Sequence, residues 1–213
     1  PREPLMIIPR TIRRMKEKME HKSGPYAHLF QPYDGDEVVS LDCETTGLDV
    51  KTADIISIGA VKVKGKKVLT SERLDIKLKP PKTLTGDSIK IHKIRAADLV
   101  DGIELEEALK QVLAFVGNRP ILGYYVNYDI RMLDKFIRPK FGFGLPCKAI
   151  ELSHVYHDII KWRMVGGNVD LRFDTISKKL DIPMLERHTA LGDAITVALM
   201  YVRLKYGDPP EVG

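Results

Sequence analysis

The chain is organised around Val38-Val39-Ser40-Leu41-Asp42-Cys43-Glu44-Thr45-Thr46-Gly47-Leu48, an apolar run that ends in two carboxylates and a turn. In a β-strand successive side chains alternate between the two faces, so Asp42 and Glu44 project together while Leu41 and Cys43 point the other way, into a core. Two like charges side by side are unfavourable unless a proton or a cation lies between them, and Mg2+ and Mn2+ prefer oxygen ligands. Taken alone, the triplet is also explained by two solvated residues at the end of a strand.

The length and composition indicate one substantial globular domain. The chain has 213 residues, of which 44% are hydrophobic and 30% charged, and this is ordinary for a protein with a buried core. Its 34 basic and 29 acidic residues give a formal net charge of +5. This mild bias is compatible with a polyanionic partner but does not demonstrate one.

The cysteines and the apolar runs bear on the compartment. Cys43 and Cys147 have neither the spacing of a zinc site nor that of a disulfide framework, which favours a reducing environment. No apolar run is long enough to cross a bilayer, and no signal peptide is recognisable. We therefore expect a cytoplasmic protein with no membrane partner.

Residues 1–36 differ from the rest of the chain and are expected to form an N-terminal basic extension. Basic side chains outnumber glutamates between Ile12 and Lys22, and Ser23-Gly24-Pro25 follows, which predicts a short basic helix ahead of a loop. The extension is either a solvated appendage or an arm that docks on a polymerase or other protein partner, or steers nucleic acid. We expect residues 37–206 to form the main domain and residues 207–213 a C-terminal tail.

The first part of the main domain is predicted to be an antiparallel meander. Its strands are residues 37–44, then 55–64, which are rich in β-branched side chains, then 73–79, which alternate between apolar and charged. The charged third strand is expected at an exposed edge of the sheet.

Strands and helices then alternate, which predicts an α/β domain. Residues 120–124 read as a buried strand, and residues 147–152 are expected to form a fifth strand. One helix follows each predicted strand or loop, and the apolar positions expected to face the core are Leu105, Ala108, Leu109, Val112, Leu113 and Val116, then Ile130, Leu133, Phe136 and Ile137, then Ala190, Leu191, Ala194, Ile195, Ala198 and Val202. Further helices are expected up to Trp162 and over residues 176–180.

Two more acidic residues fall at helix starts in this prediction. Asp129 lies in the first turn of a helix that Asn127 or a neighbour caps and Pro139 ends, so simple helix-end chemistry also explains it. Asp193 lies beside the apolar stripe of the last helix, and His188 precedes that helix. By themselves, such a histidine and aspartate are more often surface residues than catalysts.

Taken together, these residues resemble the three exonuclease motifs of the DEDD family, in its histidine-bearing, DnaQ-like branch. The motifs are Asp42-Cys43-Glu44-Thr45-Thr46-Gly47-Leu48, Tyr128-Asp129 and His188-Thr189-Ala190-Leu191-Gly192-Asp193. The resemblance covers residues 37–204, with the motifs in the family's order. It implies a ribonuclease-H-like mixed sheet, with three antiparallel strands continued by parallel strands and flanked by helices.

The resemblance also implies a chemistry. Asp42, Glu44, Asp129 and Asp193 would hold two divalent ions, Mg2+ or Mn2+, and His188 would be the general base that activates water. Paired ions about 4 Å apart stabilise both the attacking and the leaving oxygen of a phosphodiester. A histidine, whose ordinary pKa is about 6.5, accepts a proton from water near neutral pH.

The implied activity is a 3′-to-5′ exonuclease that releases nucleoside 5′-monophosphates from the free 3′ end of a single-stranded nucleic acid. The motifs leave DNA and RNA open, and a noncatalytic nucleic-acid-binding or polymerase-associated module on the same fold is the alternative. Residues matched to substrate binding are Thr45, Gly47, Leu48, His92 and Tyr128. One position departs from the family pattern, since Tyr125 stands where an asparagine is common.

Overall fold

The computed structural model describes residues 10–86, 89, 93–161 and 168–208. Five strands form one mixed sheet in the order β3-β2-β1-β4-β5. The strands are β1 (Glu37–Thr45), β2 (Ile55–Lys64), β3 (Lys67–Lys77), β4 (Ile121–Gly123) and β5 (Ala149–Glu151). β1, β2 and β3 pair antiparallel, and β4 and β5 continue the sheet in parallel with β1, as the sequence predicts.

The third strand is longer than predicted. It starts at Lys67, directly after the Gly65 turn, and not at Arg73. The pairing with β2 shifts between Val61 and Lys62, so that Thr70–Glu72 bulge out of the ladder. A bulge interrupts the alternation of side chains between faces, which is why the alternating pattern is visible only beyond it. The expected edge position of this strand is confirmed.

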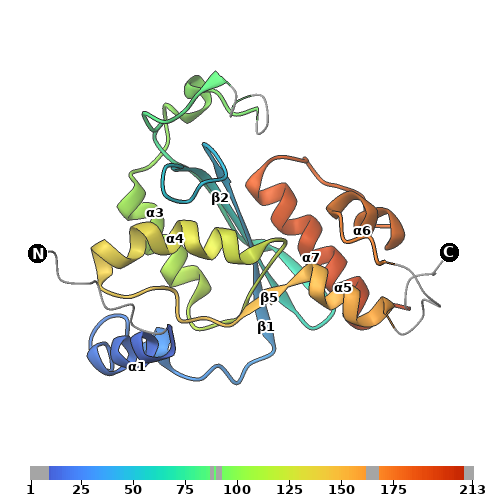
Figure 1. Ribbon diagram of the computed structural model, residues 1–213, viewed down its shortest axis with the longest axis horizontal. Coiled ribbons are helices and arrows are strands. Elements are labelled where there is room, and N and C mark those ends of the chain that lie inside the picture. The colour runs from blue at the N-terminus through green and yellow to red at the C-terminus, as the bar shows by residue number, and fades with distance from the viewer. Residues whose placement is uncertain (1–9, 87–88, 90–92, 162–167, 209–213) are drawn as a thin grey trace, which may run out of the picture.

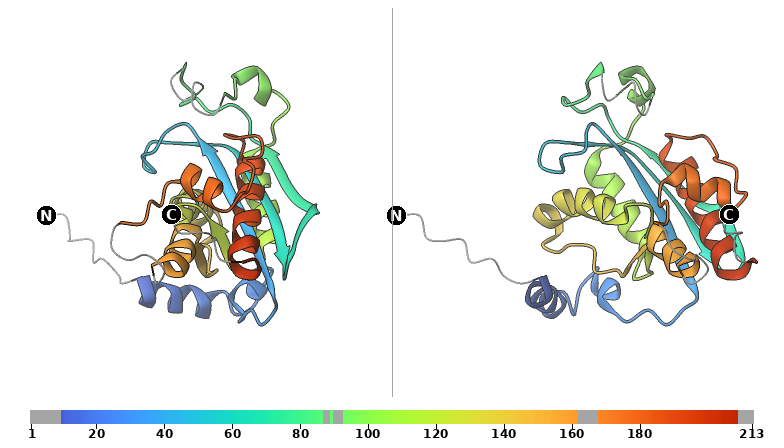
Figure 2. Two further views of the ribbon diagram at one scale, coloured as in Figure 1. Left: turned by 90° about the vertical axis from the view of Figure 1, so that its right-hand side faces the viewer. Right: turned by 45° about the vertical axis from the view of Figure 1, so that its right-hand side comes forward.

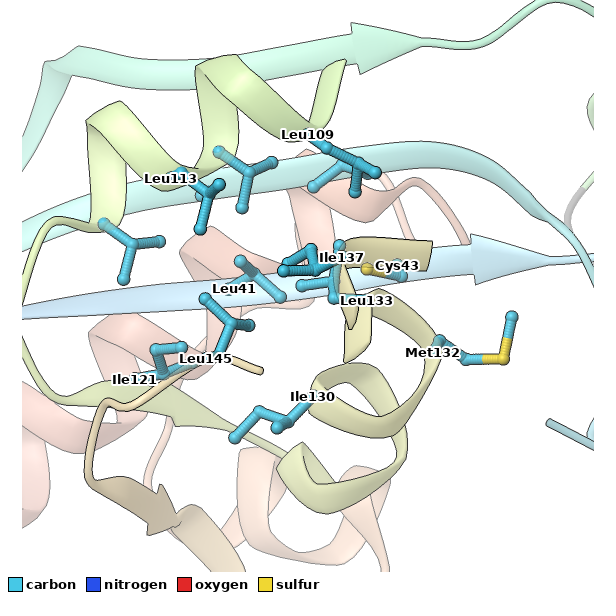
Figure 3. Packing of buried hydrophobic residues seen from close by; sticks show 14 of the residues in the cluster. Leu41, Cys43, Leu109, Leu113, Ile121, Ile130, Met132, Leu133, Ile137 and Leu145 are labelled. Carbon is cyan, nitrogen blue, oxygen red and sulfur yellow. The ribbon is translucent and has the colours of Figure 1, made fainter. Parts of the chain in front are cut away.

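The helices form a layer on each face of the sheet (Figure 1). On one face, α3 (Leu105–Val116) and α4 (Val126–Phe141) pack against Leu41 and Cys43 of β1. Figure 3 shows these two side chains among the leucines and isoleucines of α3 and α4. On the other face lie α5 (Leu152–Ile160), α6 (Phe173–Lys179) and α7 (Ala190–Tyr206). The alternation predicted for β1 therefore turns Asp42 and Glu44 towards the α7 layer.

The N-terminal segment packs on the domain and is not simply a solvated appendage. Helix α1 (Arg10–Glu20) lies across the end of the sheet at which β1 begins (Figure 2). Its buried Glu17 pairs with Arg138 of α4. Leu29 and Phe30 of the short helix η1 (Ala27–Phe30) are buried in the same core as β1. A second short helix, η2 (Ala96–Leu99), precedes α3.

Three helix predictions need correction. Pro139 does not end α4, because it lies in the last turn, where it removes one hydrogen bond, and the helix continues to Phe141 before Gly142 caps it at φ 80°. The N-cap of α4 is Tyr125, not Asn127. In α7, which begins one residue after the predicted Thr189, Leu191 is half-buried and is not part of the core cluster. Ile195 and Val202 are half-buried but pack against that cluster, and Val197, Met200 and Tyr201 are buried in addition.

The remaining outcomes concern the ends of elements. Helix α5 ends at Ile160, and Trp162, like residues 209–213 of the predicted tail, lies outside the described residues.

Within the part of the chain that the structure describes, no helix is both long and apolar enough to cross a membrane. Cys43 and Cys147 are both free and buried.

Candidate active site

Three carboxylates from two elements meet on the α7 face of the sheet. Asp42 and Glu44 come from the end of β1, and Asp193 comes from the first turn of α7. Each offers an oxygen that lies within 4.8 Å of the other two. The sequence predicts this gathering, and the alternation of β1 together with the packing of α7 produces it.

Gly59 allows α7 to approach the strand so closely. It lies opposite Asp42 in the β1–β2 ladder. A Cβ atom added at Gly59 would lie 2.1 Å from the backbone nitrogen of Leu191 and 2.2 Å from the carbonyl carbon of Ala190, so any side chain would push the first turn of α7 away. The sequence analysis missed this residue, although a glycine inside a β-branched strand often marks a close backbone approach.

Two hydrogen bonds fix the start of α7. The Thr189 side chain caps the helix by accepting a bond from the Gly192 N–H at 3.1 Å. The Ser40 hydroxyl of β1 donates to the Ala194 carbonyl at 2.7 Å. Asp193 itself is buried, and its Oδ1 has no hydrogen-bond partner among the described residues. An unpartnered buried carboxylate oxygen is costly, and it marks a position for a cation.

Asp129 lies beside this cluster, at the edge of β1. It is buried in the first turn of α4, and its Oδ1 accepts a hydrogen bond from the Cys43 N–H at 3.0 Å. Strand β4 pairs with β1 only as far as Ser40, so the N–H of Cys43 is left for the Asp129 carboxylate. Asp129 thus reaches the backbone between Asp42 and Glu44, but it is not one of the three residues within 4.8 Å of one another.

The start of α4 depends on Glu151, which the sequence analysis did not identify. Tyr125 adopts the left-handed conformation at φ 57°, which costs energy for a tyrosine and is easier for an asparagine. The Glu151 carboxylate accepts hydrogen bonds from the backbone N–H groups of Tyr125 and Val126 at 3.1 and 3.0 Å. Glu151 therefore supplies the side-chain hydrogen bonds to the first turn of α4 that the N-cap residue Tyr125 does not make.

The carboxylates raise one another's affinity for protons. Burial raises the pKa of Asp42 well above its usual value, and the charges of Asp129, Glu44 and Asp193 raise it further. Burial likewise raises the pKa of Asp129, although its hydrogen bond from Cys43 opposes the shift. Burial, followed by the charge of Asp193, raises the pKa of Glu44 to about 7. The cluster therefore strongly favours a positive charge among its oxygens.

Arg187 is the third residue that the sequence analysis missed. Its Nη1 donates to Asp193 Oδ2 at 2.9 Å. The guanidinium charge lowers the pKa of Asp193 and also those of Asp42 and Glu44, against the larger effect of burial. Its position directly before His188 in the third motif was the only signal in the sequence.

His188 lies at the edge of the cluster. Its backbone is left-handed, with φ 66°, and its N–H points to Asp193 Oδ2 at 3.4 Å. The side chain is half-buried, and its ring nitrogens are not part of the group of oxygens within 4.8 Å. The structure therefore brings His188 next to Asp193 through the backbone.

The residues matched to substrate binding lie in the turn after β1 and at the start of α4. Thr45 Oγ1 lies 2.7 Å from the Tyr128 hydroxyl, which donates to the Gly47 carbonyl at 2.5 Å. Leu48 is 87% exposed. A Cβ at Gly47 would meet only Ala53 Cβ, at 4.0 Å, so packing within the chain does not require a glycine there. His92 lies outside the described residues.

Fold and site together define a class: an α/β protein with a half-buried carboxylate cluster, suited to divalent cations, where its central strand ends. Comparison with known proteins narrows this class. The model of the exonuclease family matches residues 39–201. The chain therefore belongs to the exonuclease family, and its resemblance to the DEDD, DnaQ-like 3′-to-5′ exonucleases is confirmed.

Two bacterial relatives are similar in sequence. The DNA polymerase III PolC-type protein of Thermotoga maritima is 29% identical over 165 residues, which cover 78% of this chain but only 12% of that protein. The DNA polymerase III subunit epsilon of Aquifex aeolicus is 27% identical over 184 residues, 82% of this chain and 85% of that protein. The chain thus matches a small part of the first relative and most of the second.

Solved structures share the fold. Cell-death related nuclease 4 matches with a TM-score of 0.68 and 16% identity, over 79% of this chain and 63% of that one. E. coli exonuclease I in complex with a dT13 oligonucleotide matches with a TM-score of 0.65 and 17% identity, over 82% and 42%. The ribonuclease-H-like fold predicted from the sequence is confirmed.

Proposed function

We propose that this protein is a metal-dependent 3′-to-5′ exonuclease that hydrolyses the 3′-terminal phosphodiester of a DNA or RNA strand and releases nucleoside 5′-monophosphates. The observation that carries the proposal is the convergence of Asp42, Glu44 and Asp193, with a buried oxygen of Asp193 left unpartnered. Such an oxygen is explained by a cation that binds during function.

The residues present fit two divalent ions, Mg2+ or Mn2+. All of the donors are carboxylate oxygens, the ligand type that these hard cations prefer. Asp42, Glu44 and Asp193 would hold the ions, together with Asp129, whose charge acts on Asp42. Bound ions supply a nucleophilic water at neutral pH and offset negative charge on the phosphate.

His188 is proposed as the general base. It directly precedes the cap of α7, and its backbone N–H reaches the Asp193 carboxylate. Burial raises the pKa of Asp193, and a positive charge on His188 lowers it, which supports an imidazole near the cluster. A half-buried imidazole at this position accepts a proton from the attacking water and releases it to solvent. The left-handed backbone of His188 is the kind of strain that is often found at functional sites.

The turn after β1 is proposed to receive the terminal nucleotide. Thr45, Gly47 and Leu48 line it, and the absence of internal crowding at Gly47 leaves its backbone open to a ligand. The Tyr128 hydroxyl holds this turn, so its ring has a supporting role in addition to the proposed stacking on a base. His92 remains a predicted contact at the mouth of the site.

Single-stranded DNA with a free 3′ end is the proposed substrate. The relatives are named as DNA polymerase III proteins, and exonuclease I, which shares the fold, was solved with an oligonucleotide of thymidines. RNA is the alternative that the assay must test.

The N-terminal helix is proposed to bind a protein partner, such as a polymerase subunit, rather than nucleic acid. Ile12, Met15 and Met19 form an exposed apolar stripe on α1. Helix α1 lies at the end of the sheet where β1 begins (Figure 2), whereas Asp42 and Glu44 come from the other end of β1. A reducing, cytoplasmic location agrees with two free cysteines and stays a prediction.

A 3′-end-labelled degradation assay tests the proposal. Single-stranded DNA, mismatched duplex and RNA are compared with Mg2+, with Mn2+ and with chelator, for the wild type and Asp42→Asn. Asp75→Asn is the matched control, because Asp75 pairs with Gly59 from the other side and is exposed at the sheet edge. We expect metal-dependent mononucleotide release that Asp42→Asn abolishes and Asp75→Asn leaves intact. Binding without cleavage in the wild type would favour the noncatalytic alternative.

A further inference from the structure

Arg187 lies between acidic groups of two helices. Its Nη1 donates to Asp193 Oδ2 of α7 at 2.9 Å, and its Nη2 lies 3.6 Å from Asp174 Oδ1 of α6. The guanidinium also lies over the Phe173 ring, with its central carbon 4.2 Å from the ring centroid. Guanidinium groups stack on aromatic faces, so Phe173 supports the group between its two anionic partners.

The two oxygens of Asp193 are in different situations. Oδ2 is engaged by Arg187, whereas Oδ1 is buried and has no partner among the described residues. A cation that enters the cluster and uses Oδ2 must compete with the guanidinium. Asp174 offers that guanidinium an exposed alternative partner within a short movement, since its side chain is 73% exposed.

We propose that Arg187 is a built-in counter-cation of the metal-free cluster, which divalent ions displace from Asp193 towards Asp174. This inference rests on the metal site of the proposed function. In the metal-free protein the guanidinium holds Asp193 beside Asp42 and Glu44 despite their like charges. The same contact raises the concentration of divalent ion that the site needs for loading.

A purely structural role for Arg187 predicts the opposite result. If the guanidinium only held Asp193 in position, its loss would disorder a ligand and weaken metal binding. If it competes with the metal, its loss strengthens metal binding. The sign of the change in affinity therefore separates the two roles.

Mn2+ titration of the full chain, followed by calorimetry and by the electron paramagnetic resonance signal of free Mn2+, measures this sign without an activity assay. We expect Arg187→Gln to bind Mn2+ roughly fivefold more tightly than the wild type. Arg187→Lys, which retains the charge, should stay near the wild type. Arg13→Gln is the charge-matched control, since Arg13 lies on α1, where it pairs with Glu17, and should leave the affinity unchanged.

Asp174→Asn tests the displacement. With Arg187 present, we expect Asp174→Asn to weaken Mn2+ binding about twofold, because the displaced guanidinium loses its partner. Added to Arg187→Gln, the same change should have no effect on Mn2+ binding. Unchanged or weaker binding by Arg187→Gln, with a wild-type-like fold by circular dichroism, would overturn the inference alone. Absence of Mn2+ binding by the wild type would overturn the proposed function as well.

Discussion

Glu44 and the aspartates around it hold their protons to a higher pH than isolated carboxylates, because burial and mutual repulsion penalise the charged forms. A metal ion replaces those protons when it binds, so metal affinity depends on pH. The buried carboxylates therefore destabilise the metal-free protein, and a bound metal ion removes this cost.

The stability of the metal-free protein should fall as the pH rises from about 4.5 to about 7. In this window the folded protein keeps a proton on Glu44, whose pKa is raised to about 7, while the unfolded chain, at the ordinary 4.5, has lost it. The folded state then binds more protons than the unfolded state, so rising pH favours unfolding. Thermal melts in chelator between pH 5 and pH 8 should show this decline.

Saturating Mg2+ should remove most of that decline, because the ion takes the place of the proton. Glu44→Gln, which cannot ionise, should make the decline of the metal-free protein shallower, while Asp42 and Asp129, whose pKa values are also raised, still contribute. An equally steep fall in that variant would show that other groups cause it.

His188→Asn should lower the rate of hydrolysis by about 10²-fold or more, the usual contribution of a general base, with nearly unchanged Mn2+ affinity. Asparagine tolerates the left-handed backbone of this position, so the change removes the imidazole without adding strain. Glu186→Asn is the control, since Glu186 has a left-handed backbone two residues earlier and is exposed. A marked loss of Mn2+ affinity in His188→Asn would contradict the role of base.

At the scale of the elements, the site depends on how closely α7 and α4 approach the end of β1. Gly59 lets the backbone of α7 touch β2, and the short β4 leaves the Cys43 N–H to Asp129. Glu151, at the end of β5, caps α4 through two backbone N–H groups. The ligands therefore come from separate elements whose spacing is set by contacts outside the ligands themselves.

Gly59→Ala should destabilise the fold by about 1–3 kcal/mol, the usual cost of overpacking, and should lower activity far more than that loss alone explains. The added methyl group displaces the first turn of α7 and with it Asp193. Urea unfolding and initial rates measure the two effects. Gly65→Ala is the control, because its φ of 55° makes alanine unfavourable while nothing lies within 4 Å. Equal activity in both variants would exclude a positioning role for Gly59.

At the scale of the whole molecule, the N-terminal helix and the carboxylate cluster lie at opposite ends of β1 (Figure 2). Five and seven residue steps of strand separate Asp42 and Glu44 from the start of β1 at Glu37, or roughly 17 and 23 Å, beyond the distance over which salt screens charges. The basic residues of α1 are thus poorly placed to guide the reacting 3′ end.

Lys18→Glu on α1 should therefore leave kcat/KM and its dependence on salt unchanged within about twofold. Rates on short single-stranded DNA between low and physiological ionic strength measure this. A steeper loss at low salt would restore the alternative that the N-terminal segment steers nucleic acid.

Side-chain alternation was enough to predict the meander and the strands and helices that follow it, because periodicity is a local property. The parallel pairing and the set of four carboxylates came from the motifs shared with the exonuclease family. The sequence alone also placed Asp42 and Glu44 on one face, since alternation needs no knowledge of partners. The predicted core face of α7 was wrong at Leu191, because the rotation of a helix depends on what packs against it.

Only the tertiary structure decided the contacts between distant residues. The close approach at Gly59, the cap from Glu151 and the pairing of Arg187 with Asp193 join segments or orient side chains in ways that sequence spacing does not specify. The same holds for the N-terminal segment, where Leu29 and Phe30 enter the main core. Burial is a property of the packed molecule, and it is burial that turns four acidic residues into a site that favours a cation.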